Sequence, residues 1–352
     1  MEEAAWRLGI WSNKTWCTPN TSHFNPLLRR MPKNSALVLP HDKIVYSAHL
    51  TRQPSWTSDP EQAEWMDERI RSYRIWRYAS QAAVGLDAIA VTTGDQCTPS
   101  RKCPLLAHCR EAAYRMRNGL VLWPGLRHST AMLAAEAAQA AAGDVAWGHK
   151  LARALWRGGP SGMGPRICEA GTDPLDGPCQ MGKVSRSHLV NKFRRMPELF
   201  DVGFVGGQVE RVPPELRAAN KRKLTMAQQL EYKVIISAEG NTCSSVLGWG
   251  LSTNSVMAIV YPQLFEAPVQ YALEPWVHYI PYRYDLSDLE RNIRWCFEHD
   301  GECAAIAQRA KAHVGRLTDE RSESGVQVAA LATLAALNRP CEVSDFDLAV
   351  VE

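Results

Sequence analysis

The sequence predicts an α/β protein built on doubly wound parallel sheets, and three observations support that fold class. Short apolar runs rich in β-branched residues alternate with segments of helical periodicity along most of the chain. Several of these runs stop at glycine or at small polar residues, as in the stretches 92–95 and 157–160. The length of 352 residues suggests two such sheets rather than one.

In the amino-terminal half, the first sixty residues are rich in Pro, Asn, Ser and Trp, and we expect them to be mostly irregular. Regular structure is expected after them, because apolar residues then recur with a clear period. The elements expected in this half are a helix over residues 61–83, strands over 86–91 and 119–122, and an alanine-rich helix over 129–142.

The alternation continues through the carboxyl-terminal half. The strands expected there cover residues 154–156, 199–205, 232–237, 255–260 and 278–281. The helices expected there cover residues 185–195, 224–231, 265–273, 285–299, 302–314 and 322–336. Parallel strands must be joined by a crossover of a dozen or more residues, which is usually a helix. Strands separated by helices therefore predict parallel pairing.

Composition and charge exclude several classes of protein. The chain is 45% hydrophobic and 22% charged, with 40 basic against 37 acidic residues, which is ordinary for a globular protein. The small excess of basic residues does not favour a nucleic-acid partner. The start, MEEAAWRLGI, lacks the layout of a signal peptide, and no apolar run is long enough to span a bilayer. A cytoplasmic protein is therefore expected, with the secretory lumen as the alternative if the amino terminus is incomplete.

Three of the ten cysteines lie close together, at Cys97, Cys103 and Cys109, with His108 beside the last. Their spacing does not match a zinc site, which uses closely spaced cysteine pairs and a fourth ligand. A disulfide in an oxidising compartment and buried thiols in a reducing one are both compatible with the pattern.

The most informative junction follows the predicted strand 232–237. Beyond the carboxyl ends of such strands, glycine allows close approach of the backbone to a phosphate, and serines at a helix start add donors. The residues of this junction are Glu239, Gly240, Asn241, Ser244 and Ser245. A tight turn at Gly240 and an ordinary helix cap at Ser244 would explain the pattern equally well.

The same junction carries a family resemblance. "YKVIISAEGN", then "SVMAIV" and "LEPWVHYIPYRYDLSDLERNIRW", resemble the signature of the family-90 glycosyltransferases. The resemblance extends upstream to "DVGFV", "ALWRGGPSGMGPR" and "VTTGDQ", so that it spans residues 86–315.

This resemblance implies a GT-B-like fold, in which two Rossmann-like, doubly wound domains face each other across a cleft. The expected division is an acceptor-side α/β domain over 1–148, a nucleotide-sugar-binding domain over 149–315, and a helical segment over 316–352 that packs back on the first domain. The implied activity is inverting transfer of a sugar, glucose or xylose, from a UDP-sugar. The implied acceptor is a hydroxyl of a glycan, a lipid-linked glycan or a glycoprotein.

The resemblance also assigns roles to single residues. Arg157, which is followed by Gly158, matches the position that holds the donor diphosphate, and a guanidinium suits a bidentate phosphate contact. Asp95 matches the base that takes the proton of the acceptor hydroxyl. No metal or other cofactor is expected, because no Asp-x-Asp follows a predicted strand.

The chain departs from the family pattern at the diphosphate. A basic residue of the relatives is replaced by Val246, and a lysine of some microbial relatives by Gly248. Arg166 or Lys233 could substitute, the donor could be held differently, or activity could be lost. The last alternative is a protein that has kept the fold as a binding scaffold without turnover.

Two further residues are weaker candidates. Glu266 matches an acid of the family, although the tryptophan after it is replaced by Ala267 and Pro268. His278 lies in an apolar strand, where a histidine is more often part of the core. A nucleotide-dependent oxidoreductase is disfavoured, because no Gly-x-Gly-x-x-Gly follows a predicted strand.

Overall fold

The computed structural model describes residues 130–160, 186–206, 214–240 and 242–336 and, outside these, short strands and a few single residues. The chain divides into two compact units. Unit 1 consists of Met1–Thr130, Glu266–Tyr271 and Asp319–Glu352, and unit 2 consists of Ala131–Phe265 and Ala272–Thr318.

Unit 2 is built on a five-stranded sheet in which all neighbours are parallel. Its strands are β8 (Leu151–Gly158), β11 (Phe200–Phe204), β12 (Tyr232–Ser237), β13 (Val256–Val260) and β15 (Ile280–Tyr282). The spatial order is β11-β8-β12-β13-β15, so the chain first winds to one side of β8 and then to the other. This is a doubly wound order, with its switch point between β8 and β12. The predicted α/β fold with a parallel sheet is thus confirmed.

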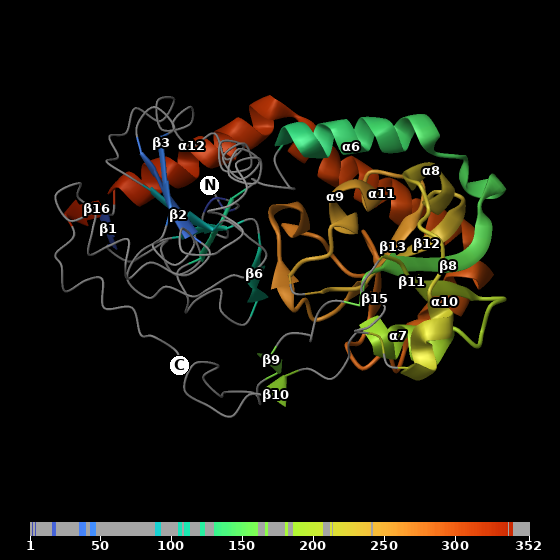
Figure 1. Cartoon of the computed structure of the whole chain (residues 1–352). Helices are drawn as coiled ribbons and strands as arrows, with labels where there is room; N and C mark the ends of the chain where they lie inside the picture. Colours follow the sequence, from blue (N-terminus) through green and yellow to red (C-terminus); the bar gives the residue numbers. More distant parts are fainter. Residues whose placement is uncertain are drawn as a thin grey trace. The chain divides into compact units, whose positions relative to one another are not determined.

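Helices cover both faces of this sheet. They are α6 (Thr130–Gly143), α7 (Arg186–Phe193), α8 (Met226–Gln229), α9 (Val246–Gly250), α10 (Leu289–Glu298) and α11 (Asp300–Thr318). In Figure 1, α7 and α10 lie on one side of the strands and α8 and α9 on the other. The strands are buried on both faces, which explains their continuous apolar runs.

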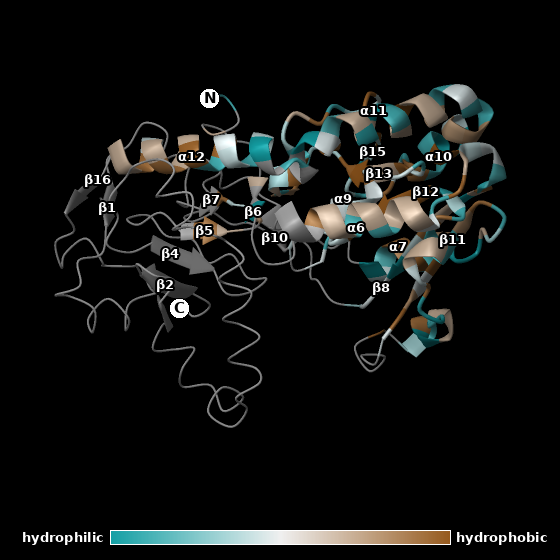
Figure 2. Ribbon diagram, turned by 90° about the horizontal axis from the view of Figure 1, so that it is seen from above, coloured by the Kyte–Doolittle hydropathy of each residue, from teal (hydrophilic) through white to brown (hydrophobic). Residues whose placement is uncertain are grey.

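The packing of α7 shows how the core is filled. Its Val190 and Phe193 are fully buried, and the Phe193 ring stacks on that of Phe200 in β11 with centroids 4.2 Å apart. Helices α10 and α11 are joined by a disulfide between Cys296 and Cys303. Figure 2 shows hydrophilic and hydrophobic residues interspersed along both helices, as expected where one face packs on a sheet.

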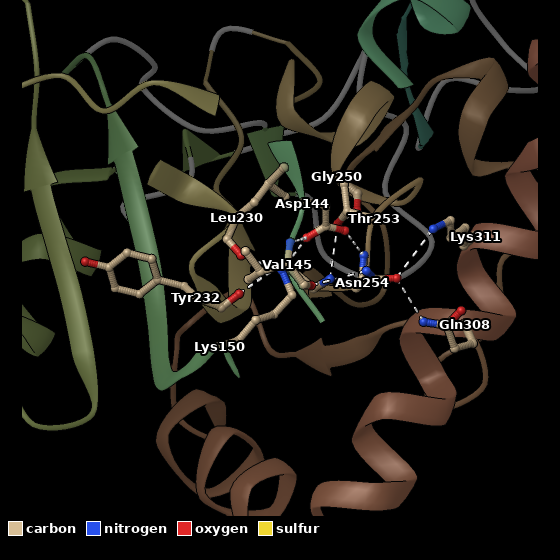
Figure 3. Close-up of polar contacts among 11 residues, drawn as sticks. Asp144, Val145, Lys150, Leu230, Tyr232, Gly250, Thr253, Asn254, Gln308 and Lys311 are labelled. Atoms are coloured by element: carbon tan, nitrogen blue, oxygen red, sulfur yellow. Dashed lines mark hydrogen bonds and ion pairs between the residues drawn. The ribbon is translucent and has the colours of Figure 1, made fainter. Parts of the chain in front are cut away.

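A polar network ties the amino-terminal ends of three strands together (Figure 3). Asp144 accepts hydrogen bonds from Lys150 Nζ at 2.5 Å and from the backbone N–H of Asn254 at 2.6 Å. Lys150 also donates to the carbonyl of Leu230, just before β12. Because Lys150 precedes β8 and Asn254 precedes β13, this buried ion pair fixes where the strands begin. From α11, Gln308 and Lys311 donate to Asn254 Oδ1.

A second buried carboxylate, Asp201, joins β11 to its neighbours. Its oxygens accept hydrogen bonds from Arg157 Nη2 at 2.7 Å, from Lys221 Nζ at 2.5 Å and from the Tyr232 hydroxyl at 2.6 Å. Burial alone would raise the pKa of Asp201, but these three hydrogen bonds outweigh it and hold the pKa well below its usual range. Asp201 is therefore an ionised link between β8, β11 and β12.

The described part of unit 1 contains a different sheet. Its order is β3-β2-β4-β5-β7, with β4, β5 and β7 parallel and β2 antiparallel to both β3 and β4. These strands are β2 (Ser35–Leu39), β3 (Lys43–Tyr46), β4 (Ile89–Thr92), β5 (Leu105–Ala107) and β7 (Leu120–Leu122). The expectation of a second, wholly parallel sheet was wrong for this part. Three residues separate β2 from β3, too few for the crossover that parallel pairing needs.

The remaining elements of unit 1 are short, apart from one long helix. They include β1 (Trp16–Thr18), β6 (Arg110–Glu111), α12 (Glu320–Ala336) and β16 (Asn338–Pro340), of which β1 and β16 pair in parallel. The first sixty residues contain three short strands, and because most of the others lie outside the described residues, the expectation that this region is mostly irregular stays a prediction. The arrangement of the two units across a cleft stays a prediction, as does the exact division into domains.

One other expectation for a single element is wrong, and another cannot be compared with the structure. The helix predicted over 265–273 is absent, and β14 (Phe265–Glu266) and one 3-10 turn, η9 (Pro268–Gln270), stand in its place. Proline forces the residue before it into an extended conformation, and Ala267 has φ −124° and ψ 157°. The helix predicted over 61–83 lies outside the described residues.

No helix among the described residues has the length and apolar character needed to cross a membrane.

The Asp201 link generates a stability prediction. Only 7% of the Arg157 side chain is exposed, so Arg157→Ala removes a buried, charged hydrogen-bond donor. This substitution should lower the free energy of unfolding by about 1.5–3 kcal/mol. Lys221→Ala is the matched control, because Lys221 contacts the same carboxylate but leaves 40% of its side chain exposed. Thermal denaturation of the two variants should show the larger loss for Arg157→Ala, and equal or reversed losses would contradict this role.

Candidate active site at the carboxyl ends of β8 and β12

The switch point of the sheet brings two strand ends together. β8 ends at Gly158 and β12 at Ser237, and the two strands are direct neighbours running in the same direction. In open α/β sheets, the helices that follow such a pair leave the sheet on opposite faces, which opens a crevice beyond the strand ends. A ligand site is therefore expected beside residues 158–160 and 237–240.

Arg186, the first residue of α7, bridges these two strand ends. Its Nη1 donates to the carbonyl of Gly159 at 3.2 Å, and its Nη2 and Nε donate to that of Ala238 at 3.1 and 3.3 Å. The guanidinium also lies over the Trp156 ring, 5.8 Å from its centroid. Burial lowers the pKa of Arg186 from its ordinary value, while Tyr282 and Glu239 raise it. Arginine nevertheless stays charged at neutral pH, so the switch point carries a fixed positive charge.

Gly240 makes room for that guanidinium. A Cβ atom added at this position would lie 2.8 Å from Arg186 Nη2, closer than a real contact allows. The sequence-based interpretation was that Gly240 lets the backbone approach a phosphate. The structure shows that Gly240 lets the backbone approach Arg186.

Glu239 lies beside the same charge and differs from Asp201 in its electrostatics. Burial raises the pKa of Glu239 to about 8. The backbone hydrogen bond of Phe265 and the charge of Arg186 both lower this pKa, but burial outweighs them. Its Oε2 is shielded from solvent and has no hydrogen-bond partner among the described residues. At neutral pH, Glu239 is thus mainly protonated and can donate a hydrogen bond.

The strand end itself offers a further polar group. Ser237 is 1% exposed, and its Oγ has no hydrogen-bond partner within the described part of the chain. The Ser237 carbonyl, by contrast, accepts a hydrogen bond from the Tyr282 hydroxyl at 2.8 Å, which fixes the end of β12 against β15. The site therefore combines a cation from the start of α7 with a neutral acid and a hydroxyl from the end of β12.

Arg157, the predicted diphosphate ligand, does not present its guanidinium at the strand end. Besides the Asp201 carboxylate, its Nη1 reaches the carbonyl oxygens of Asp201 at 2.7 Å and Trp156 at 3.0 Å. Gly158, the residue after it, packs against the Trp156 ring. A phosphate at Arg157 would have to displace these contacts, so its role in donor binding stays a prediction.

Two other predicted residues lie at the opposite end of the sheet. Lys233 is the second residue of β12 and forms an ion pair with Asp300 at the start of α11. His278 precedes β15, and its Nδ1 accepts a hydrogen bond from the backbone N–H of Glu274 at 3.0 Å. Burial, and then the neighbouring His313, lower the pKa of His278. Because ligands of parallel sheets bind at the carboxyl ends, neither residue belongs to this site.

Glu266 belongs to unit 1, where it is fully buried. Its Oε2 accepts a hydrogen bond from Nε of Arg110 at 2.8 Å, in an ion pair with almost no exposure of either side chain. The structure therefore shows Glu266 in a buried ion pair with Arg110.

The serines after the junction do not cap a helix through their side chains. Helix α9 is a single short turn, and its first flanking residue, Ser245, is exposed and makes no side-chain cap hydrogen bond. Ser244 is buried, at 6% exposure. Val246 is half-buried and Gly248 is buried in α9, so this turn offers no cation.

Several predicted residues cannot be placed. Asp95 and Asn241 lie outside the described residues, as do Cys97 and Cys103, and Arg166 is described only as backbone in β9 (Arg166–Ile167). Cys109 and Cys243 are each disulfide-bonded. Within the ranges that the structure describes, no group of three His, Cys, Asp or Glu side chains is arranged to hold a metal ion.

Sequence reasoning missed Arg186. In the sequence, it is one of several basic residues in the helix predicted over 185–195. A signal was available, because a cation at the start of a helix is disfavoured by the helix dipole and needs another reason to be there.

Comparison with known proteins supports the resemblance noted in the sequence. A model of the family described as "Glycosyl transferase family 90" matches residues 177–321, a range that includes Arg186 and Glu239. Uncharacterized protein 035R of Invertebrate iridescent virus 3 is 32% identical over 176 residues, which cover 47% of this chain and 15% of the viral protein.

Two named transferases are also similar to the chain. Protein O-glucosyltransferase 2 of Danio rerio is 26% identical over 176 residues, covering 48% of this chain and 30% of that protein. O-glucosyltransferase LpsA of Dichelobacter nodosus is 25% identical over 138 residues, covering 39% of this chain and 42% of that protein. The chain thus spans less than half the length of each of these relatives. Over residues 177–321, the chain is similar to glycosyltransferase family 90.

Proposed function

We propose that the chain is an inverting, metal-independent glycosyltransferase that uses a UDP-sugar. The observation that carries this proposal is the guanidinium of Arg186 at the switch point of the parallel sheet, inside the segment that matches the family. A nucleotide-sugar needs stabilisation of its diphosphate when it leaves, and fixed donors in a shielded site supply that stabilisation best.

The proposed reaction is a single displacement. The acceptor hydroxyl oxygen attacks the anomeric carbon, and the bond from that carbon to the diphosphate oxygen breaks on the opposite face. The electron pair of that bond goes to the UDP leaving group, while the hydroxyl proton goes to the carboxylate of Asp95. Attack opposite to the leaving group inverts the configuration at the anomeric carbon.

The names of the two transferase relatives support glucose as the sugar, and xylose is the alternative. The acceptor we propose is a hydroxyl of a glycan, a lipid-linked glycan or a glycoprotein. The disulfide between Cys296 and Cys303 favours an oxidising compartment over the cytoplasmic location expected from the sequence.

A second function, a binding scaffold without turnover, is favoured by the uncharged residues at Val246 and Gly248. The two functions are separated by incubating the chain with UDP-glucose or UDP-xylose and measuring UDP release with and without a panel of acceptor glycans. A scaffold would bind the nucleotide and release no UDP above the background without protein.

The role of Asp95 is tested by Asp95→Asn, which keeps the shape of the side chain but cannot accept a proton. Removing a general base typically costs about 10²–10⁴-fold in rate. UDP affinity should hardly change, because the base contacts the acceptor. Turnover at the wild-type rate would remove Asp95 from the mechanism, since Asn forms turns as well as Asp does.

Metal independence predicts that EDTA leaves turnover unchanged. The charge of the diphosphate is then balanced by side chains and backbone amides of the chain. Activity should be measured after dialysis against EDTA and again after manganese is added back. Loss in EDTA with recovery in manganese would contradict a metal-independent reaction.

Glu239 predicts a pH dependence of donor binding. Its pKa of about 8 keeps it neutral near a diphosphate, and it gains a negative charge above that pH. UDP affinity should therefore fall as the pH rises from 7 to 9, by at most about tenfold per unit. UDP itself changes little there, because the second pKa of a phosphate is about 6. Calorimetry on Glu239→Gln, which stays neutral, should show a flat profile, and an equal decline in both proteins would exclude Glu239 as the cause.

A further inference from the structure

A cluster of aromatic rings lies at the amino-terminal edge of the sheet in unit 2, opposite the candidate active site. It consists of Trp276, which precedes β15, and of Trp295 and His299 at the end of α10. The centroids of the Trp276 and Trp295 rings are 4.8 Å apart in an edge-to-face contact, and His299 stacks on Trp295 at 4.8 Å. Asp300, the residue after His299, pairs with Lys233 near the start of β12, which places these rings at that edge. We call the three residues the Trp276 cluster.

Hydrogen bonds fix the turn that carries Trp276. The Trp276 N–H donates to the carbonyl of Tyr279 at 2.8 Å, and Nε of Arg309 in α11 donates to the carbonyl of Val277 at 2.8 Å. Trp276 itself has φ 64°, a left-handed conformation that is costly for a bulky side chain. Backbone strain of this kind persists only where the surrounding contacts impose it, and it is concentrated at functional sites.

The ring of Trp276 is held in place without being buried. The residue is 39% exposed, and among the described residues only Leu151 and Tyr261 are large apolar residues of comparable exposure. A tryptophan stabilises a fold mainly through the apolar surface that it buries. Core packing therefore does not account for an exposed tryptophan on a strained turn.

Polar side chains border the exposed ring. Glu274 is exposed in the same turn, and Arg309, which contacts that turn, forms an ion pair with Glu302. A protein partner needs a contiguous apolar patch, which one ring among charged side chains does not provide. A pyranose ring has C–H groups on its faces and hydroxyls around its rim. It therefore matches an aromatic ring that is bordered by donors and acceptors of hydrogen bonds.

We propose that the Trp276 cluster is a second carbohydrate-binding site, in which a pyranose ring of an oligosaccharide stacks on Trp276. Glu274, Glu302 and Arg309 bind the hydroxyls of that sugar. The inference goes beyond the transfer reaction, and it rests on the proposed function only for the class of ligand, a glycan. A site at this edge holds the glycan away from the reacting atoms, so it affects how tightly glycans bind and not the chemical step.

The test measures the binding of cellohexaose, maltohexaose and xylohexaose to the full chain by calorimetry. These probes contain the two sugars proposed for transfer, glucose in two linkages and xylose. The variants are Trp276→Ala, which removes the ring, and Trp276→Phe, which keeps a smaller one. Leu151→Ala is the matched control, because it removes an apolar side chain of similar exposure that has no ring. Melting temperatures without ligand show whether each variant is folded.

We expect at least one hexaose to bind the wild type, and Trp276→Ala to weaken that binding about tenfold. Trp276→Phe should lose less, and Leu151→Ala should match the wild type. Wild-type affinity in folded Trp276→Ala, or an equal loss in Leu151→Ala, overturns the inference. If Trp276→Ala does not fold, hydroxyl-radical labelling of the wild type decides, because a bound hexaose must shield Trp276 from oxidation. Unchanged oxidation of Trp276 then overturns the inference.

The inference and the proposed function fail in different ways. A wild-type chain that binds none of the three hexaoses overturns the second site, whether or not it releases UDP from a UDP-sugar. A chain that releases no UDP with any acceptor, but binds a hexaose through Trp276, overturns the transferase and keeps the second site. In both cases, Trp276→Ala should keep the UDP affinity of the wild type.

Discussion

The parallel pairing of β8 and β12 is the constraint on which the candidate site depends. Because both strands run in the same direction and the chain winds away from them on both sides, Gly159 and Ala238 end at the same edge of the sheet. One guanidinium can therefore contact both carbonyl oxygens. At the other edge, the ion pair of Asp144 and Lys150 fixes where the strands begin, so the register that sets the site is held from the opposite end.

Two buried carboxyl groups of unit 2 have pKa values that are shifted in opposite directions. Asp201 receives hydrogen bonds from three donors and stays ionised, which makes it a structural anion between strands. Glu239 has few compensating contacts, so burial keeps it mainly protonated at neutral pH. The two side chains have similar chemistry, and their surroundings make the difference. Asp201 is suited to holding the sheet together, and Glu239 is suited to a site that binds an anion.

The strands of unit 2 could be predicted because burial on both faces leaves continuous apolar runs, and Tyr232–Ser237 was found with its predicted bounds. The strand at Phe265–Glu266 was missed because the effect of Pro268 on Ala267 outweighs the helical pattern. The position of the site followed from the junction at Glu239 and Gly240. Its cation did not, because Arg157 matched the family pattern and only tertiary contacts show that Asp201 engages it.

The most direct test of the account is to find which backbone amides UDP protects from hydrogen exchange. Amide hydrogen exchange of the full chain should be measured with and without saturating UDP. The account predicts slower exchange in peptides covering residues 157–160, 186–190 and 237–245, and unchanged exchange around 276–279 at the amino-terminal end of β15. Protection confined to that opposite edge, or no protection in unit 2, would contradict a donor site at the switch point.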